Sequence, residues 1–360
     1  MRCDLRLKVD AASVFLPIPV THRIKTATAT HLGWNLGVRH DSCLRVFVDG
    51  SLGGDFGKWG CLAYHFWSRN MLILDLPTVT DNLPPCFSLS QTGLLRLTGP
   101  DAAAFAQSQF ANDVDKLAPG QWQWSCWLNA KGRVLDVFAL ARLADDQVLL
   151  ILSDGGAAAL GQALQRFVFR RKLSVNVDSS AAAGRFTAPA QASGNRLAGD
   201  VESGLELDWG SPALPRTLVV GGPHQPPQDP TAQQRWRQAD LRQGLPRLDP
   251  DQRESWTAQQ LGLDRLNGYS VRKGCYPGQE IVARTHFLGK AKRATVLLEG
   301  VATEVTAGTA VQAAGSDIGQ LACVASPYAL AVLPLEREEL PLQVAANAVT
   351  AIALLDGLQR

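Results

Sequence analysis

The fold of this chain is limited above all by a strand–turn–strand segment at residues 121–143, QWQWSCWLNAKGRVLDVFALARL. Two apolar runs rich in strand-forming residues flank the letters NAKG at 129–132, a combination that indicates a turn between two strands. Residues 145–153, DDQVLLILS, predict a further strand directly afterwards. Any fold of this chain must therefore contain a sheet in this region.

Helices are expected on both sides of this hairpin. Residues 93–100, GLLRLTGP, predict a short alternating strand that ends in a turn. Asp101 is then expected to cap a helix, because its carboxylate can accept hydrogen bonds from amide protons that are otherwise unpaired. Residues 156–175 predict another helix, which leads into a strand. Strands and helices that alternate at this length predict an α+β unit.

The rest of the chain reads as a looser half and a run of short strands. A helix is expected from about Thr231 to Gly244, after a loop that reads GGPHQPPQDP. After Gly289, short strands separated by glycines and charged turns are typical of a small β-barrel. The sequence thus predicts the domains 71–178, 179–288 and 289–360, behind an atypical segment at 1–70.

Composition excludes several classes of protein. Hydrophobic residues make up 46% of the chain and charged residues 19%, which is typical of a globular protein. A net charge of +2 does not by itself indicate nucleic acid or membrane partners. No apolar run approaches the roughly 18 residues of a membrane span. The seven cysteines include no CxxC pair, so we expect no metal site, no disulfide framework, and reduced thiols in the cytoplasm.

Residues 1–70 differ from the remainder, since they contain four of the six histidines and neither Gln nor Glu. Residues 26–38 and 43–50 can form short strands. The Cys and His spacings fit no compact metal-ligand pattern. Our hypothesis is that Met71, the only methionine besides Met1, is the physiological start.

The strongest chemical signal lies at residues 271–284, VRKGCYPGQEIVAR. Gly274 and Gly278 bracket a cysteine, which suggests a bend where a Cβ would clash or block a ligand. Two preceding cations, Arg272 and Lys273, would favour a thiolate at Cys275 if the three side chains share one face.

The residues around this cysteine also suggest what it faces. Gln279 and Glu280 can present a donor and an acceptor to a planar heterocycle. Residues 272–293 contain six Arg or Lys against one Glu, an excess that favours an anionic partner such as a carboxylate tail, a phosphate or RNA. Simpler interpretations remain open, in which Cys275 is a small buried residue, the basic run a solvated face, and Asn129 only a turn former.

LNGYSVRKGCYPGQEIVAR, at 266–284, resembles the signature of the YgfZ family, the folate-binding relatives of the glycine-cleavage T protein. The pattern K-G-C-Y-x-G-Q-E is matched from Lys273 to Glu280 without a substitution. Similarity extends to other family segments, at 97–114, 128–140 and 236–248. The resemblance covers about residues 88 to 360 and implies an α+β fold. Two α+β halves would surround a folate pocket, and a C-terminal β-barrel would follow.

The resemblance also implies a role in assembling or repairing iron–sulfur clusters in other enzymes, including tRNA-modifying ones, with tetrahydrofolate as the ligand. Trp236 matches an aromatic position that stacks on folate, and a pterin offers a flat face to an indole. Cys275 would contact a cluster, a client or a folate-derived one-carbon unit. The implied folate-binding residues are Asn129, Trp236, Gln243, Lys273, Gly274, Tyr276, Gly278, Gln279, Glu280 and Arg284.

This chain departs from the patterns of the proteins it resembles at three positions. The T protein has two adjacent acids in the hairpin, where this chain has only Asp136. It also has a glutamate near the position of Gln243, which can still accept one hydrogen bond from a pterin but carries no charge. An aromatic residue of some family members is replaced by Thr92. The alternative function, a folate-dependent aminomethyl-type transferase, would depend on Asp136 or Glu280 as acid or base.

A third function, RNA binding through the basic residues of 272–293, is poorly supported because no aromatic residues are interleaved with those cations. Direct nucleic-acid binding and membrane binding are therefore not expected. The expected partners are folate and, as clients, iron–sulfur enzymes or cluster-assembly proteins.

Overall fold

A computed structural model describes residues 2–9, 12–19, 27–29, 34–41, 43–50 and 86–360, except 224, 288 and 290. The chain consists of two units, Met1–Thr78 and Val79–Arg360. No helix within the described segments is both long enough and apolar enough to cross a membrane.

The first unit contains an antiparallel strand pair and a three-stranded sheet. β1 pairs with β2, and β4 pairs with both β3 and β5. The strands expected at 26–38 and 43–50 are confirmed. Met71 lies outside the described residues. The strands of this unit are β1 (Arg2–Val9), β2 (Ala12–Pro19), β3 (Ala27–Ala29), β4 (Trp34–Asp41) and β5 (Cys43–Gly50).

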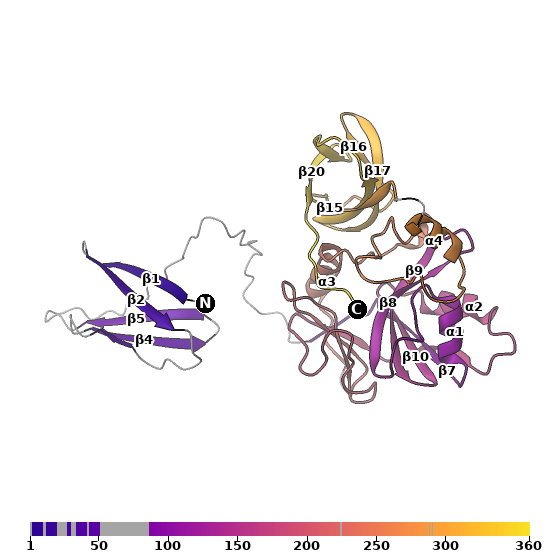
Figure 1. The fold of residues 1–360 in the computed structure, drawn as a ribbon, viewed down its shortest axis with the longest axis horizontal. Helices are drawn as coiled ribbons and strands as arrows, with labels where there is room; N and C mark the ends of the chain where they lie inside the picture. The colour runs from indigo at the N-terminus through magenta and orange to yellow at the C-terminus, as the bar shows by residue number, and fades with distance from the viewer. Residues whose placement is uncertain are drawn as a thin grey trace. The chain divides into compact units, whose positions relative to one another are not determined.

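The second unit begins with a five-stranded sheet of order β11-β7-β10-β9-β8, with α1 and α2 packed against it (Figure 1). The predicted hairpin is confirmed: β8 and β9 pair antiparallel across the turn at 129–132. The elements of this half are β7 (Gly93–Thr98), α1 (Ala102–Gln109), β8 (Gln121–Leu128), β9 (Val134–Ala144), β10 (Gln147–Leu152), α2 (Ala157–Gln165) and β11 (Ser174–Asp178).

Both faces of this sheet are buried, because alternate residues of a strand point to opposite faces. In β10, Val148 and Leu150 join the core beneath α1 and α2, whereas Leu149 and Ile151 join a second core on the other side. This arrangement explains why β10 reads as an unbroken apolar run instead of alternating with polar residues.

The second half is built on a four-stranded sheet of order β13-β14-β12-β6. Its first strand in sequence, β6, precedes the whole first half along the chain, so the two halves are not strictly consecutive. The helix predicted from about Thr231 is confirmed and starts one residue earlier. The elements are β6 (Phe87–Ser88), β12 (Ala182–Arg185), β13 (Leu205–Asp208), β14 (Thr217–Val220), α3 (Pro230–Arg242), the 3-10 helix η1 (Pro250–Gln252) and α4 (Gln279–Phe287).

The predicted small barrel is confirmed as a closed barrel of order β15-β18-β17-β16-β19-β20 (Figure 1). It is held to α3 by the side-chain amides of Gln234 and Gln238, which donate to the carbonyl of Ser326. After the barrel, residues 353–360 return to the first sheet, where Leu358 accepts a hydrogen bond from Trp124. The strands are β15 (Arg293–Glu299), β16 (Ala310–Ala313), β17 (Ser316–Ala325), β18 (Tyr328–Pro334), β19 (Leu342–Val344) and β20 (Asn347–Ile352).

Candidate functional site

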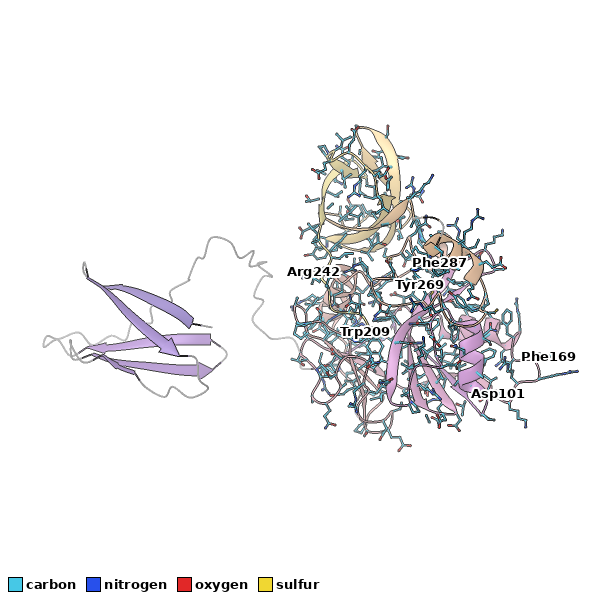
Figure 2. All side chains as sticks on the ribbon, in the orientation of Figure 1. Asp101, Phe169, Trp209, Arg242, Tyr269 and Phe287 are labelled. Atoms are coloured by element: carbon cyan, nitrogen blue, oxygen red, sulfur yellow. The ribbon has the colours of Figure 1, made fainter. Side chains whose placement is uncertain are left out.

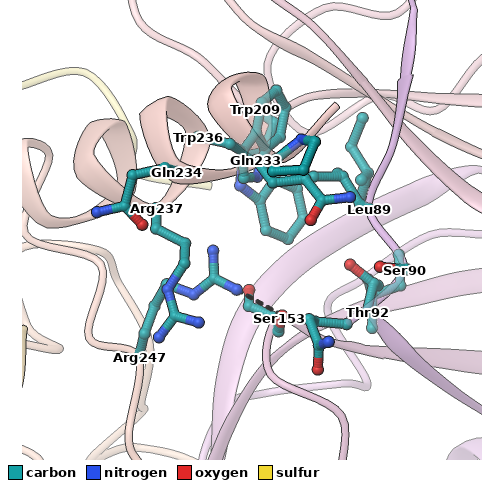
Figure 3. A pocket seen from close by; sticks show the side chains of 14 residues that line it. Leu89, Ser90, Thr92, Ser153, Trp209, Gln233, Gln234, Trp236, Arg237 and Arg247 are labelled. Atoms are coloured by element: carbon teal, nitrogen blue, oxygen red, sulfur yellow. Dashed lines mark hydrogen bonds between the residues drawn. The ribbon is translucent and has the colours of Figure 1, made fainter. Parts of the chain in front are cut away.

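A cavity of about 260 Å³ lies where the two halves meet, between α3, the segment before β7 and the end of β10 (Figure 3). Its floor is apolar, with Ile151 and Leu218, and its rim carries amides, hydroxyls and guanidinium groups. Ligand pockets commonly combine an apolar interior with a few polar groups in this way. The lining residues are Leu89, Ser90, Gln91, Thr92, Ile151, Ser153, Trp209, Leu218, Pro230, Gln233, Gln234, Trp236, Arg237 and Arg247.

Trp236 is placed in the cavity wall by α3, which begins at Pro230 behind the N-cap Asp229. The Asp229 carboxylate accepts from the amide of Ala232, which fixes the start of the helix. The indole is 2% exposed, and the guanidinium of Arg216 lies 4.5 Å from its ring centroid. Only a small part of the indole is therefore open to the cavity.

A buried network of charges lies beside Trp236. Asp240 accepts from Arg216 at 2.7 Å and from Arg247 at 2.9 Å. Arg247 also pairs with Asp154 at 2.7 Å, so two guanidinium groups are balanced by two carboxylates. Such balance is needed because an unpaired buried charge is strongly destabilising. The network fixes the base of the cavity.

One lining cation is more open than this network. The Arg237 side chain is 33% exposed and lies 3.7 Å from Asp154, a carboxylate that already binds Arg247 more closely. Its guanidinium therefore keeps most of its donors free for an anion at the rim of the cavity. Figure 3 shows Arg237 and Arg247 side by side, facing Ser153.

Gln243 does not have the role predicted from the sequence. It is fully buried, and its Oε1 accepts a hydrogen bond from Arg216. It is absent from the cavity lining, so its oxygen is not presented to a ligand there. This contact could not be predicted from the sequence, because Arg216 lies 27 residues before Gln243 and its guanidinium reaches the Gln243 amide only in the folded chain.

Lys273 is directed away from the expected position beside the cysteine. Its ammonium donates to the carbonyl oxygens of Gln107, Phe110 and Asn112, at 2.6, 2.5 and 2.8 Å. These carbonyls lie at and just beyond the carboxyl end of α1, where the last backbone acceptors of a helix lack intrahelical partners. Desolvation lowers the pKa of Lys273 to about 8. Its contacts are those of a buried helix cap.

Cys275 lies on the surface. The cysteine, Arg272 and Gly274 are all exposed, and a Cβ added to Gly274 would meet no atom within 4 Å. Among the hydrogen bonds of the described residues, none joins Lys273 to the Cys275 thiol. The expectation that both cations share a face with the thiol was therefore wrong for Lys273, because buried carbonyls at the end of α1 bind its ammonium. The thiol itself is open to a partner.

The second glycine of the signature is structural. Gly278 has a φ of +77°, and an added Cβ would lie 2.6 Å from the carbonyl oxygen of Asn129 and 2.8 Å from the Cα of Gly132. The signature therefore packs backbone to backbone on the β8–β9 turn. Asn129 stabilises that turn, since its Oδ1 accepts from the amides of Lys131 and Arg133.

The other signature residues divide into internal and exposed groups. Tyr276 is buried and donates to the carbonyl of Ser270, and Gln279 donates to the carbonyl of Lys273. Glu280 and Arg284 are exposed on α4. None of the signature residues lines the Trp236 cavity, so the structure presents two surfaces: that cavity and the exposed Cys275 turn.

Asp136, the candidate acid or base, is buried on β9 and pairs with Arg253 at 2.9 Å. Desolvation raises the pKa of its carboxyl to about 6, and the positive charge of Arg253 acts in the opposite direction. A carboxyl with this pKa can exchange a proton near neutral pH. It is not among the residues that line the cavity.

Trp236 was predicted from the sequence as a site residue, but its neighbours in the cavity wall were not. Gln233, Trp236 and Arg237 are spaced i, i+3 and i+4, which places them on one side of α3, and this spacing was the available signal. Ser153 and Arg247 come from separate loops and had no local signal. The described residues contain no cluster of three His, Cys, Asp or Glu side chains suited to a metal ion.

Comparisons with known proteins agree with this architecture. Residues 84–184 match the GCVT N-terminal domain family. A tRNA-modifying protein YgfZ from Serratia proteamaculans (strain 568) is 29% identical over 251 residues, 64% of this chain and 75% of that protein. The protein of the same name from Vibrio vulnificus (strain CMCP6) is 28% identical over 226 residues, 59% of this chain and 69% of that protein.

Among solved structures, glycine cleavage system aminomethyltransferase T from Bartonella henselae matches with a TM-score of 0.56 and 16% identity. The match covers 76% of this chain and 86% of that protein. It confirms the predicted fold class, in which two α+β halves are followed by a small β-barrel.

Proposed function

Because the chain is similar to YgfZ proteins and has the fold of aminomethyltransferase T, we propose that it belongs to the YgfZ family and is a folate-binding accessory protein of the cytoplasm. In this proposal it helps to assemble or repair iron–sulfur clusters in other enzymes, including enzymes that modify tRNA. Its partners are tetrahydrofolate or a related folate and, as clients, iron–sulfur enzymes or assembly proteins. The observation that carries the proposal is the Trp236 cavity, which lies between the two halves.

The cavity suits one part of a folate. Its volume of about 260 Å³ is near the lower end of typical ligand pockets, which span roughly 300 to 1,000 Å³. A flat pterin ring fits such a space, with the apolar surfaces of Leu89, Ile151 and Trp236 around it. The side-chain amides of the rim can pair with the pterin's donors and acceptors.

The glutamate tail of a folate carries carboxylates, and Arg237 at the rim is the lining cation placed to bind one. Arg216 and Arg247 are already paired with carboxylates of the chain. We therefore propose that the pterin enters the cavity and that the tail remains outside, against Arg237.

Calorimetric titration of tetrahydrofolate into the purified protein tests this arrangement. Wild type should bind saturably, and Arg237→Gln should weaken binding roughly tenfold, because one charge-assisted hydrogen bond is lost. Arg235→Gln is the matched control, since Arg235 lies on the same helix but stacks on Phe186 and does not line the cavity. Trp236→Ala is less informative, because truncating a buried aromatic costs about 3 to 5 kcal/mol of stability.

Two outcomes would count against the folate site. Wild-type protein that takes up no tetrahydrofolate would remove the proposed ligand altogether. Equal loss of affinity in Arg235→Gln and Arg237→Gln would indicate a general charge effect and not a contact at the cavity rim.

Cys275 is the residue that we propose contacts a cluster, a client or a one-carbon unit, since its thiol is exposed. In a strain that lacks the protein, Cys275→Ser should fail to restore the activity of iron–sulfur enzymes, whereas Cys86→Ser should restore it. Cys86 is the matched control because it is a second, partly exposed free thiol outside the signature. Full rescue by Cys275→Ser would show that the thiol is not needed for this activity and that the residue has only a structural role in the turn.

The alternative function, an aminomethyl-type transferase, is favoured by the Asp136 carboxyl, which is buried on β9 and pairs with Arg253 at 2.9 Å. Asp136 has a pKa raised to about 6 by desolvation, as expected of a carboxyl that exchanges protons. Such an enzyme would transfer the carbon of an aminomethyl donor to tetrahydrofolate, releasing ammonia and the rest of the donor, without any client protein. Turnover by the purified protein, abolished in Asp136→Asn, would favour this function over the accessory role.

A further inference from the structure

The loop between α2 and β11 carries two exposed phenylalanines among four cations. Residues 166–172 read RFVFRRK, and Phe167 and Phe169 are 47% and 77% exposed. Figure 2 shows Phe169 projecting away from the fold at the end of α2. Isolated exposed apolar residues are common on protein surfaces, but here cations stand on both sides of the aromatic pair. The arrangement requires a physical explanation.

The structure holds this loop in place from both sides. The Phe167 ring packs edge-on against Trp127, with ring centroids 6.2 Å apart. At the other end, the Asp101 carboxylate accepts from the backbone amide of Lys172 at 2.6 Å. Between these anchors the amide of Arg171 donates to the carbonyl of Val168 at 2.8 Å, which closes a tight turn. The backbone at the tip of this turn is therefore held in a defined conformation.

The tip of the turn carries Phe169 and Arg170. Arg170 has a φ of +60°, in the left-handed region that glycine and asparagine adopt with less strain. Its guanidinium lies 5.0 Å from the centroid of the Phe169 ring. An arginine at a position where glycine would be less strained is consistent with a use for its charge, since strained residues concentrate at functional sites.

The charges of the loop are not neutralised by neighbours. No ion pair among the described side chains includes Arg166, Arg170, Arg171 or Lys172, all of which are exposed. The Asp101 carboxylate, which contacts the loop, accepts from the backbone amide of Lys172 and leaves the Lys172 ammonium free. Four uncompensated cations within seven residues are a strong local excess in a chain of net charge +2.

We propose that residues 166–172 bind single-stranded RNA, with a base stacked on Phe169 and phosphates bound by the surrounding cations. Binding of single strands combines a positively charged surface with aromatic rings on which bases stack, and arginine guanidinium groups also stack on bases. The basic residues of 272–293 lack such rings, and for that reason RNA binding was not expected there. The surface at 166–172 supplies both the positive charge and an exposed aromatic ring.

The alternatives fit this surface less well. Its exposed large apolar side chains are Phe167 and Phe169, which is small for a protein interface or for insertion into a membrane. Phe167 is also partly engaged by Trp127, which leaves Phe169 as the free ring. A single ring among guanidinium groups suits a nucleotide better than an apolar partner.

Fluorescence anisotropy with a short labelled oligouridylate tests the proposal. The full chain should bind with an affinity that falls steeply with salt, with a log–log slope of about −3 if four phosphates are contacted. Phe169→Ala should weaken binding about tenfold through lost stacking. Arg170→Gly should weaken binding and reduce the slope by about 0.7, while relieving the backbone strain at this position.

Arg272→Gln is the matched control, because it removes an exposed cation from the other basic segment and should leave RNA binding unchanged. Unchanged thermal unfolding of Phe169→Ala and Arg170→Gly would show that the fold is intact. The proposal is overturned if the wild type does not bind, if both loop variants bind normally, or if only Arg272→Gln loses binding. Phe169-dependent co-sedimentation with phosphatidylserine vesicles, without RNA binding, would reassign the surface to anionic lipid. None of these outcomes depends on folate binding.

Discussion

Asp136 illustrates the cost of a buried carboxyl. Its folded-state pKa of about 6 is above the ordinary value of 3.8, because desolvation outweighs the attraction of Arg253. Between these two values the folded protein holds a proton that the unfolded chain has released. Stability from this residue is therefore greatest below pH 4 and is lost as the pH rises to about 6.

Asp136→Asn should remove this pH-dependent loss of stability. Relative to wild type, the variant should gain up to about 3 kcal/mol of unfolding free energy between about pH 4 and pH 7, since each pKa unit corresponds to about 1.4 kcal/mol. Urea denaturation at several pH values measures the difference. The surface residue Asp145, whose side chain is 87% exposed, supplies the control variant Asp145→Asn. Parallel curves for wild type and Asp136→Asn would mean that this carboxyl is not desolvated.

At the level of elements, the start of α4 depends on a close backbone contact. Gly278 lies against the β8–β9 turn and has a positive φ, whereas Gly274 faces open space four residues earlier. The two glycines of the signature thus have different roles. Gly278 allows close backbone packing, and Gly274 leaves Cys275 accessible.

Gly278→Ala should lower the unfolding free energy by at least about 2 kcal/mol, because alanine is strained at this φ and its Cβ overlaps the carbonyl of Asn129. Gly274→Ala should change stability by less than about 0.5 kcal/mol, as is usual for open surface positions. Chemical denaturation of both variants tests the pair. Equal stabilities would contradict the close packing of the signature on the turn.

Helix α1 shows where local patterns stop being informative. Its position after Asp101 was predicted, but the Asp101 carboxylate makes no capping hydrogen bond and binds the amide of Lys172 instead. The other end of α1 is capped by Lys273, which is 163 residues away from Phe110 in sequence. Propensity and spacing locate a helix, whereas the partners of its terminal groups depend on the tertiary fold.

For the whole molecule, the hairpin, α3 and the closed barrel were predictable because each has a local pattern of apolar residues and turns. The resemblance of the signature identified the fold that combines them. The charged network around Asp240 was not predictable, since Arg216 and Arg247 reach it from separate segments. The cavity itself depends on that long-range packing, so only Trp236 of its lining was named in advance as a site residue.

The return of residues 353–360 to the first sheet has a consequence for biosynthesis. The Trp124 indole, on β8, donates a hydrogen bond to the carbonyl of Leu358, 234 residues later in the chain. The backbone amide of Leu355 donates to the carbonyl of Arg242. Contacts this distant in sequence form slowly, and they cannot form until residues 355–358 have left the ribosome. The indole of Trp124 therefore lacks this hydrogen-bond partner while the following 234 residues are synthesised. During that interval the nascent protein is open to chaperones and proteases at the place where its halves will meet.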